Sequence, residues 1–233
     1  MPEMPSHFKA LFKSPLYGFL ARGVVLPWAL QGLRPTGKGL EIGSGGGAMA
    51  ARLLGRFGDL RLVATDYDPE MVAATQAALQ PFGERATVQR ADAAALPFPD
   101  QDFDVVFAFA MFHHAGAWQR AVAEAVRVLR PDGRLVGYDM LEGAPFHGGR
   151  GHPRGHVANV HSHSAPADHR HQHGHEPEES GRLIRSAQQL EQHLDSLPVR
   201  DVRVRRSPGG VAVRFMATRG LRGEPRRTVS RVL

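Results

Sequence analysis

Cysteine is absent from this chain of 233 residues. Its absence excludes disulfides, thiolate metal sites and cysteine nucleophiles. Long apolar runs are also missing, because the longest, near residues 105–112, is far too short to span a bilayer. The first residues show no basic start followed by an apolar stretch and a small-residue cleavage site, as a secretory signal would. We therefore expect a cytoplasmic protein with no integral membrane segment.

Lysine is scarce, since the chain has 26 arginines but only Lys9, Lys13 and Lys38. The formal net charge is +6, and residues 200–233 alone carry ten arginines against Asp201 and Glu224. The rest of the chain is close to neutral, so the charge does not indicate a basic binding face on the whole protein. We expect a small-molecule substrate rather than a nucleic acid.

Short apolar runs alternate with helical stretches from residue 39 to residue 139, a pattern typical of an α/β fold with a mostly parallel sheet. We predict strands at residues 39–42, 61–65, 87–90, 103–109 and 134–139. We predict helices between them at residues 48–57, 69–79 and 117–129, then a helix at 186–197 and a hairpin of residues 199–205 and 211–217. The expected fold is a Rossmann-like doubly wound sheet that ends in an antiparallel C-terminal hairpin.

Composition divides the chain into a core with two flanks and one insertion. Residues 1–38 form a predicted helical cap, although their basic and apolar faces would also suit a membrane surface. Residues 39–141 are the predicted core, and residues 182–219 complete it after the insertion. Residues 142–181 contain nine histidines and seven glycines, and they predict a disordered loop or lid. Residues 220–233 form an Arg-rich tail.

A glycine-rich turn, Glu41-Ile42-Gly43-Ser44-Gly45-Gly46-Gly47, joins the first predicted strand to the first predicted helix. Glycines at such a turn let the backbone approach a ligand closely. The spacing Gly43-x-Gly45-x-x-Ala48 also fits a dinucleotide fingerprint, so an NAD-dependent oxidoreductase is one alternative. A tight turn without a ligand is another.

Two acidic residues follow the next two predicted strands. Asp66 comes after the second strand, where a carboxylate can accept both hydroxyl hydrogens of a ribose. Asp92 closes the third strand, where an acid can accept from an adenine amine beside the apolar residues 96–98. NAD enzymes share the first acid, but they do not usually carry the second in this form.

In this order the residues resemble the class I S-adenosylmethionine-dependent methyltransferases, over about residues 39–139. The glycine-rich turn resembles the first motif of that family, and residues 96–104 resemble its approach to the fourth strand. Residues 130–135 resemble the turn before the fifth strand, with Asp132 where glycine is commoner. The resemblance implies S-adenosylmethionine as the cofactor. The cofactor-binding residues that it implies are Glu41, Gly43, Ser44, Gly45, Gly47, Asp66, Tyr67, Met71, Asp92, Ala93 and Ala108.

Methyl transfer from a sulfonium requires alignment more than it requires a catalytic side chain. A base helps when the acceptor must lose a proton, and His113 and His114 end the fourth predicted strand, where either could serve. A structural or cofactor-side role for this pair is the favoured interpretation. Tyr138, Asp139 and His147 are weaker acceptor-site candidates. Asp104 could contact a ligand, although orienting the backbone is the favoured interpretation.

The insertion places imidazoles at alternate positions, in His161-x-His163 and in the run from His169 to His175. Such spacing can bind Zn²⁺, Ni²⁺ or Cu²⁺, but no Asp, Glu or Cys arrangement fixes a geometry, and we assign no metal ligands. The expected function is methyl transfer to a small-molecule acceptor at oxygen, nitrogen or carbon. The alternative function is a non-catalytic Rossmann-like protein whose His-rich loop binds a divalent transition metal.

Overall fold

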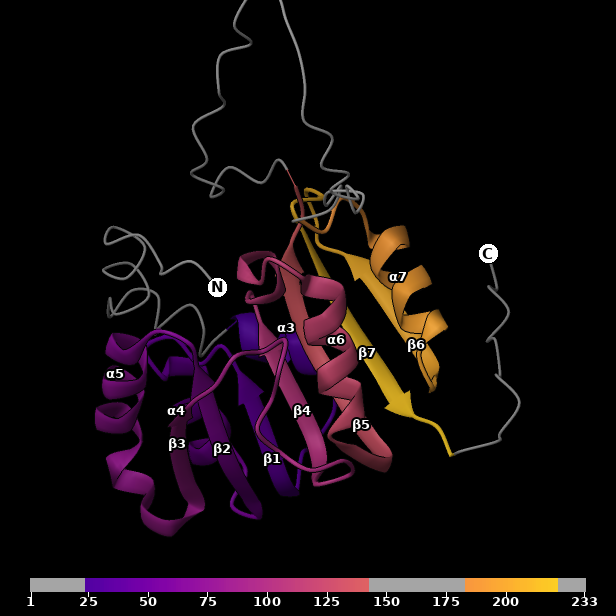
Figure 1. The fold of residues 1–233 in the computed structure, drawn as a ribbon. Coiled ribbons are helices and arrows are strands. Elements are labelled where there is room, and N and C mark those ends of the chain that lie inside the picture. Colours follow the sequence, from indigo (N-terminus) through magenta and orange to yellow (C-terminus); the bar gives the residue numbers. More distant parts are fainter. Residues whose placement is uncertain (1–23, 143–182, 222–233) are drawn as a thin grey trace, which may run out of the picture.

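A computed structural model describes residues 24–142 and 183–221 of the chain. These residues form a seven-stranded sheet in the order β3-β2-β1-β4-β5-β7-β6 (Figure 1). The strands are β1 (Gly37–Ile42), β2 (Leu60–Asp66), β3 (Ala86–Arg90), β4 (Phe103–Phe109), β5 (Leu129–Met140), β6 (Val199–Arg206) and β7 (Ala212–Arg219). Strands β1 to β5 pair in parallel, and β7 pairs antiparallel with both β5 and β6. The predicted α/β, doubly wound fold with a C-terminal antiparallel hairpin is confirmed.

Helices cover both faces of the sheet (Figure 1). Apolar side chains of α3 (Leu26–Leu30) and α4 (Ala48–Arg56) pack in one buried cluster, whereas those of α6 (Trp118–Arg127) and α7 (Ala187–Ser196) pack in another. The other helices are α5 (Pro69–Leu79) and the 3₁₀ turns η2 (Gln80–Arg85) and η3 (Phe112–His114). None of the helices in the described ranges is long and apolar enough to cross a membrane.

The strand order reverses between β1 and β4. The chain runs outward from β1 through β2 to β3, then returns to place β4 on the other side of β1. Ligands of open α/β sheets bind at such a switch point, outside the carboxyl ends of the strands. The end of β1 carries the glycine-rich turn, so the fold brings that turn to the expected binding edge.

The prediction for the connection between α6 and β5 was wrong in its boundaries. The predicted helix at residues 117–129 ends at Arg127, and β5 begins at Leu129 rather than at Arg134. Phe103 pairs with Leu129 and Val105 pairs with Arg134, so the intervening residues of β5 bulge out of the pairing. Asp132 adopts a left-handed conformation with φ of 65° within this bulge. The Asp-Gly pair therefore bends a strand that has already begun.

Three predicted segments lie wholly or largely outside the described residues. They are the predicted cap at residues 1–38, of which residues 1–23 are not described, the His-rich insertion at residues 142–181, of which only Glu142 is described, and the tail at residues 220–233, of which residues 222–233 are not described. The described part of the N-terminal segment contains α3. After the insertion, the Ser186 side chain begins α7 by accepting a hydrogen bond of 3.1 Å from the Gln189 amide.

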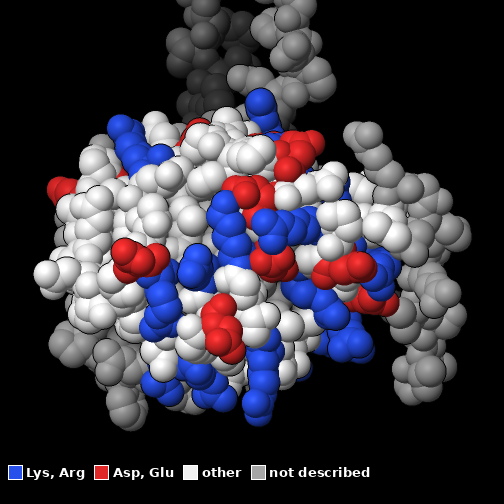
Figure 2. All heavy atoms as spheres, turned by 90° about the horizontal axis from the view of Figure 1, so that it is seen from below, with Lys and Arg blue, Asp and Glu red and all other residues white. Residues whose placement is uncertain are grey.

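Charges of both signs mix on the face at which the parallel strands begin. Figure 2 shows Lys and Arg side chains interspersed with Asp and Glu side chains on the described part of this face. Lys38 pairs with Asp102 at 2.7 Å, and Arg130 pairs with Asp104 at 2.8 Å. Asp104 also accepts the Lys38 amide at 2.7 Å. Asp104 thus orients the backbone at this edge, as the favoured interpretation of its role expects.

Candidate cofactor site and active site

Three of the four glycines in the turn adopt left-handed conformations, and their surroundings differ. Gly43, Gly45 and Gly47 have φ angles of 71°, 55° and 79°. A Cβ atom on Gly43 would lie 2.6 Å from Cβ of Met111, and one on Gly47 would lie 3.0 Å from Cα of Thr75. A Cβ atom on Gly45 would meet nothing within 4 Å. Packing therefore requires Gly43 and Gly47, while the backbone at Gly45 faces open space.

Hydrogen bonds hold the turn against β2 and α5. Oδ2 of Asp66 accepts the Gly45 amide at 2.8 Å, and Oγ1 of Thr75 donates to the Gly45 carbonyl at 2.8 Å. The Ser44 amide donates to the Thr65 carbonyl at 2.9 Å, and the Ser44 and Thr75 hydroxyls are 3.1 Å apart. The protein itself thus fixes the turn on both sides. A ligand that binds there therefore has a smaller entropic cost to overcome, because the turn is already ordered.

Two carboxyl groups lie close together at the end of β1 and β2. Glu41 is 1% exposed, and its Oε2 atom has no hydrogen-bond partner among the residues that the structure describes. Burial raises the pKa of Glu41 well above its ordinary value, and the charge of Asp66 raises it further. Burial also raises the pKa of Asp66, although the Asp68 and Gly45 amides that it accepts lower it in part. A cationic group bound here would pair with Glu41 and favour its ionised form.

The remaining predicted cofactor residues follow β2 and β3 or lie in β4. The Tyr67 ring lies beneath the guanidinium of Arg90, with Cζ 5.0 Å from the ring centroid. Asp92 accepts the Ala94 amide at 2.9 Å, which shapes the turn after β3. Met71, Ala93 and Ala108 are buried, and Ala108 pairs with Ile42 across β4 and β1. The topology thus brings the predicted residues of β1, β2 and β3 to one edge of the sheet.

His113 pairs with Asp139, a residue 26 positions later in the chain. Nδ1 of His113 lies 2.5 Å from Oδ1 of Asp139, and Oδ2 of Asp139 accepts the Phe112 amide at 2.7 Å. The Asp139 side chain is fully buried, whereas that of His113 is 10% exposed. With Nδ1 donating to the carboxylate, the neutral imidazole carries its lone pair on Nε2. The centroid of the His114 ring lies 3.9 Å from that of the His113 ring.

Sequence reasoning missed the strain at Ala110, which follows β4. Ala110 has φ of 52°, and its amide donates to the Tyr138 carbonyl at 2.8 Å. Non-glycine residues in this conformation are uncommon and cluster at functional sites. Nothing in the local sequence signals this conformation.

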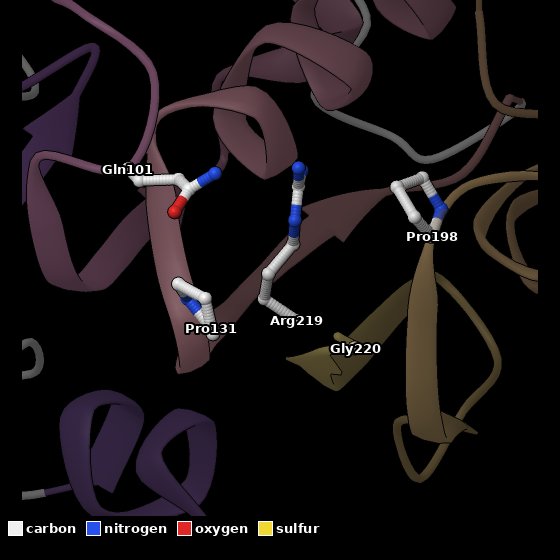
Figure 3. Close-up of a pocket in the computed structure, with 5 residues that line it drawn as sticks. All are labelled: Gln101, Pro131, Pro198, Arg219 and Gly220. Atoms are coloured by element: carbon white, nitrogen blue, oxygen red, sulfur yellow. The ribbon is translucent and has the colours of Figure 1, made fainter. Parts of the chain in front are cut away.

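Gln101, Pro131, Pro198, Arg219 and Gly220 line a pocket of about 410 Å³ (Figure 3). The pocket lies where β4 and β5 begin and β7 ends, at the edge opposite the glycine-rich turn. Arg219 donates to the Val126 carbonyl at 2.5 Å near the end of α6. We therefore place the candidate site by the sheet topology and the glycine-rich turn rather than by this pocket.

The described residues contain no group of three or more His, Cys, Asp or Glu side chains placed to hold a metal ion. His147 and the alternating histidines at residues 161–175 lie outside the described residues. The metal-binding alternative has no support from the part of the fold that the structure describes.

Comparison with known proteins identifies the core. Residues 40–137 match the methyltransferase domain family. Demethylmenaquinone methyltransferase of Thermus thermophilus is 36% identical over 97 residues, which is 42% of this chain and 44% of the relative. The 27-O-demethylrifamycin SV methyltransferase of Amycolatopsis mediterranei is 35% identical over 117 residues, 48% of this chain and 43% of the relative. The match thus spans less than half the length of these curated relatives.

Solved structures share the fold over most of the chain. A SAM-dependent methyltransferase from Aquifex aeolicus superposes with a TM-score of 0.61 at 17% identity, covering 93% of this chain and 99% of that one. The [4+2]-cyclase SpnF superposes with a TM-score of 0.60 at 16% identity, covering 88% and 81%. These likenesses show the fold alone, whereas the sequence match at residues 40–137 includes the glycine-rich turn, Asp66 at the end of β2 and Asp92 after β3. Residues 40–137 therefore match a methyltransferase domain, which supports the predicted resemblance to the class I S-adenosylmethionine-dependent methyltransferases.

Proposed function

We propose that the protein transfers a methyl group from S-adenosylmethionine to a small-molecule acceptor. The observation that carries the proposal is the preformed turn, in which Asp66 holds the Gly45 amide beside the buried and unpartnered Oε2 of Glu41. The names of the two relatives, which act on a demethylmenaquinone and on a demethylrifamycin, support a small-molecule acceptor.

The residues at the turn fit the chemistry of this cofactor. Glu41 is a buried carboxyl whose Oε2 atom has no partner among the described residues, which suits the ammonium group of the methionine portion. Gly45 leaves space for a ligand beside the backbone, and Asp66 retains acceptor capacity for ribose hydroxyls. Asp92 and Ala93 would hold the adenine, while Tyr67 and Met71 would flank the ribose and adenine.

When bound, S-adenosylmethionine supplies a methyl group on a sulfonium whose leaving group is already activated. The protein contributes alignment and exclusion of water. For an acceptor that must lose a proton, His113 takes that proton on Nε2, because its Nδ1 is directed to Asp139. Asp139 then stabilises the imidazolium and holds the ring in place. His113 is therefore the proposed base, and Asp139 is a positioning residue.

Calorimetric titration of the purified protein with S-adenosylmethionine, S-adenosylhomocysteine and NAD tests the cofactor assignment. We expect binding of the two adenosyl ligands with dissociation constants on the order of micromolar, and no binding of NAD. Binding of NAD alone would contradict the proposal. Formation of S-adenosylhomocysteine with a panel of phenols, amines and carbon acids then tests the reaction.

A further inference from the structure

Arg214 of β7 lies beneath α3 beside two aromatic side chains. Tyr138 of β5 pairs in register with Arg214, so the two side chains lie on the same face of the sheet. The Trp28 and Tyr138 ring centroids are 5.8 Å apart, and Cζ of Arg214 lies 5.7 Å from the centroid of the Trp28 ring. Three segments that are distant in the sequence thus bring a cation and two aromatic rings together.

Arg214 has no carboxylate partner among the described residues. Its Nη1 donates to the Trp28 carbonyl at 3.2 Å, while its buried Nε has no hydrogen-bond partner. By contrast, Arg127, Arg130 and Arg200 each pair with an aspartate. A guanidinium has five N–H donors, and holding one carbonyl requires only one of them. A half-buried cation without a counter-ion is unfavourable, and an anionic ligand would remove that penalty.

The Arg214 position lies close to the edge at which the reaction is proposed. Tyr138 is two residues before the end of β5, a distance of about 7 Å along the strand. Asp139, the partner of His113, is the next residue and points to the opposite face. A flat molecule lying over the end of β5 can therefore contact the Arg214 side of the sheet and the His113 side together.

We propose that Trp28, Tyr138 and Arg214 form an acceptor subsite that selects a planar aromatic acceptor carrying a carboxylate. The inference rests on the proposed methyl transfer for its role in the reaction. The Trp28 ring, which is only partly buried, provides a flat surface for the acceptor, and the buried Tyr138 ring supports it from the core. Arg214 binds the carboxylate through its planar pair of N–H donors. The three residues act on substrate selection, and none of them takes part in the displacement.

The test compares two probes that share a ring and two hydroxyl groups, 3,4-dihydroxybenzoate and the neutral 3,4-dihydroxybenzamide. Each is titrated calorimetrically into the full-length protein with and without saturating S-adenosylhomocysteine. We expect the carboxylate to bind about tenfold more tightly than the amide, as a charge-assisted hydrogen bond predicts. Equal affinity for the two probes, or no binding of 3,4-dihydroxybenzoate, would overturn the proposal without recourse to any variant.

Substitution then assigns the preference to Arg214. In Arg214→Gln we expect the carboxylate to lose its advantage of about tenfold, while affinities for the amide and for S-adenosylhomocysteine stay unchanged. Arg214→Lys should keep part of the preference, because it keeps the charge but not the planar donor pair. The matched control is Arg206→Gln, an exposed arginine of β6 that pairs with Val213. Unchanged selectivity in Arg214→Gln contradicts the subsite.

Failure of the subsite is distinguishable from failure of the proposed function. A protein that binds S-adenosylhomocysteine and methylates another acceptor, but shows no dependence on Arg214, would refute the subsite alone. A protein that prefers the carboxylate through Arg214, but binds neither adenosyl ligand, would refute methyl transfer and leave the subsite standing.

Discussion

His113 of η3 and Asp139, near the end of β5, form a hydrogen-bonded pair, with Nδ1 and Oδ1 separated by 2.5 Å. The carboxylate is fully buried and also accepts the Phe112 and Met140 amides, each at 2.7 Å. The backbone of two elements thus holds Asp139 in position, and Asp139 orients the imidazole.

Asp139→Asn tests the orientation of His113. The neutral amide no longer stabilises an imidazolium, so we expect kcat to fall by about 100-fold for an acceptor that must lose a proton. Affinity for S-adenosylhomocysteine should be unchanged in calorimetry. His114→Gln is the matched control, and its kcat should fall far less. Equal losses in the two variants, or an unchanged pH profile of kcat in Asp139→Asn, would refute the assigned roles.

Asp66→Ala tests the cofactor site. The change removes an acceptor for ribose hydroxyls and the partner of the Gly45 amide, so the binding free energy of S-adenosylhomocysteine should weaken by about 1–3 kcal/mol. Asp66→Asn, which keeps one acceptor oxygen for the Gly45 amide, should lose less affinity. Full affinity in Asp66→Ala, measured by calorimetry, would show that β2 does not present this carboxylate to the ligand.

The raised pKa of Glu41 predicts how the stability of the ligand-free protein depends on pH. Because the folded state binds the Glu41 proton more tightly than the unfolded state does, this group stabilises the fold below its ordinary pKa of 4.5. That contribution is lost as pH rises through the raised value. Asp66, whose pKa is also raised, acts in the same direction.

Glu41→Gln keeps the shape of the side chain and removes its ionisation. We expect the Tm of this variant to fall less than that of the wild type as pH rises from about 5 to about 8 in differential scanning calorimetry. The same variant should bind S-adenosylmethionine more weakly, because the amide carries no charge to pair with the ammonium group. If Tm changes with pH to the same extent in the wild type and in Glu41→Gln, the raised pKa of Glu41 does not contribute to the pH dependence and the prediction is wrong.

Gly43→Ala and Gly45→Ala separate packing from ligand access. At Gly43 the new Cβ would lie 2.6 Å from Met111, so we expect a large loss of Tm. At Gly45 nothing in the protein obstructs the Cβ, and the left-handed backbone alone should lower stability by about 1–2 kcal/mol. Affinity for the adenosyl ligands, measured on the folded fraction, should fall in Gly45→Ala. A Gly45→Ala variant with full affinity would mean that the ligand stays away from this backbone.

Much of the core was predictable because its signals are local. The apolar runs of β2 and β4 and the helical pattern of α5 lie within a few residues of the predicted bounds. The β5 boundary was not predictable from residues 129–134, since Arg-Pro-Asp-Gly is locally a turn. Pairing of Leu129 with Phe103, on a strand 26 positions away, draws the segment into the sheet instead.

The sequence by itself determined the fold class, the glycine-rich turn and the acids at the end of β2 and after β3, because each depends on residue types at short spacing. The tertiary structure decided that Asp139 pairs with His113 rather than His114, and that Arg214 lies beside Trp28. It also decided that Gly45, rather than Gly43, leaves space at the turn. Each of these relationships joins residues from separate elements, and only the packing of the sheet against its helices sets which side chains meet.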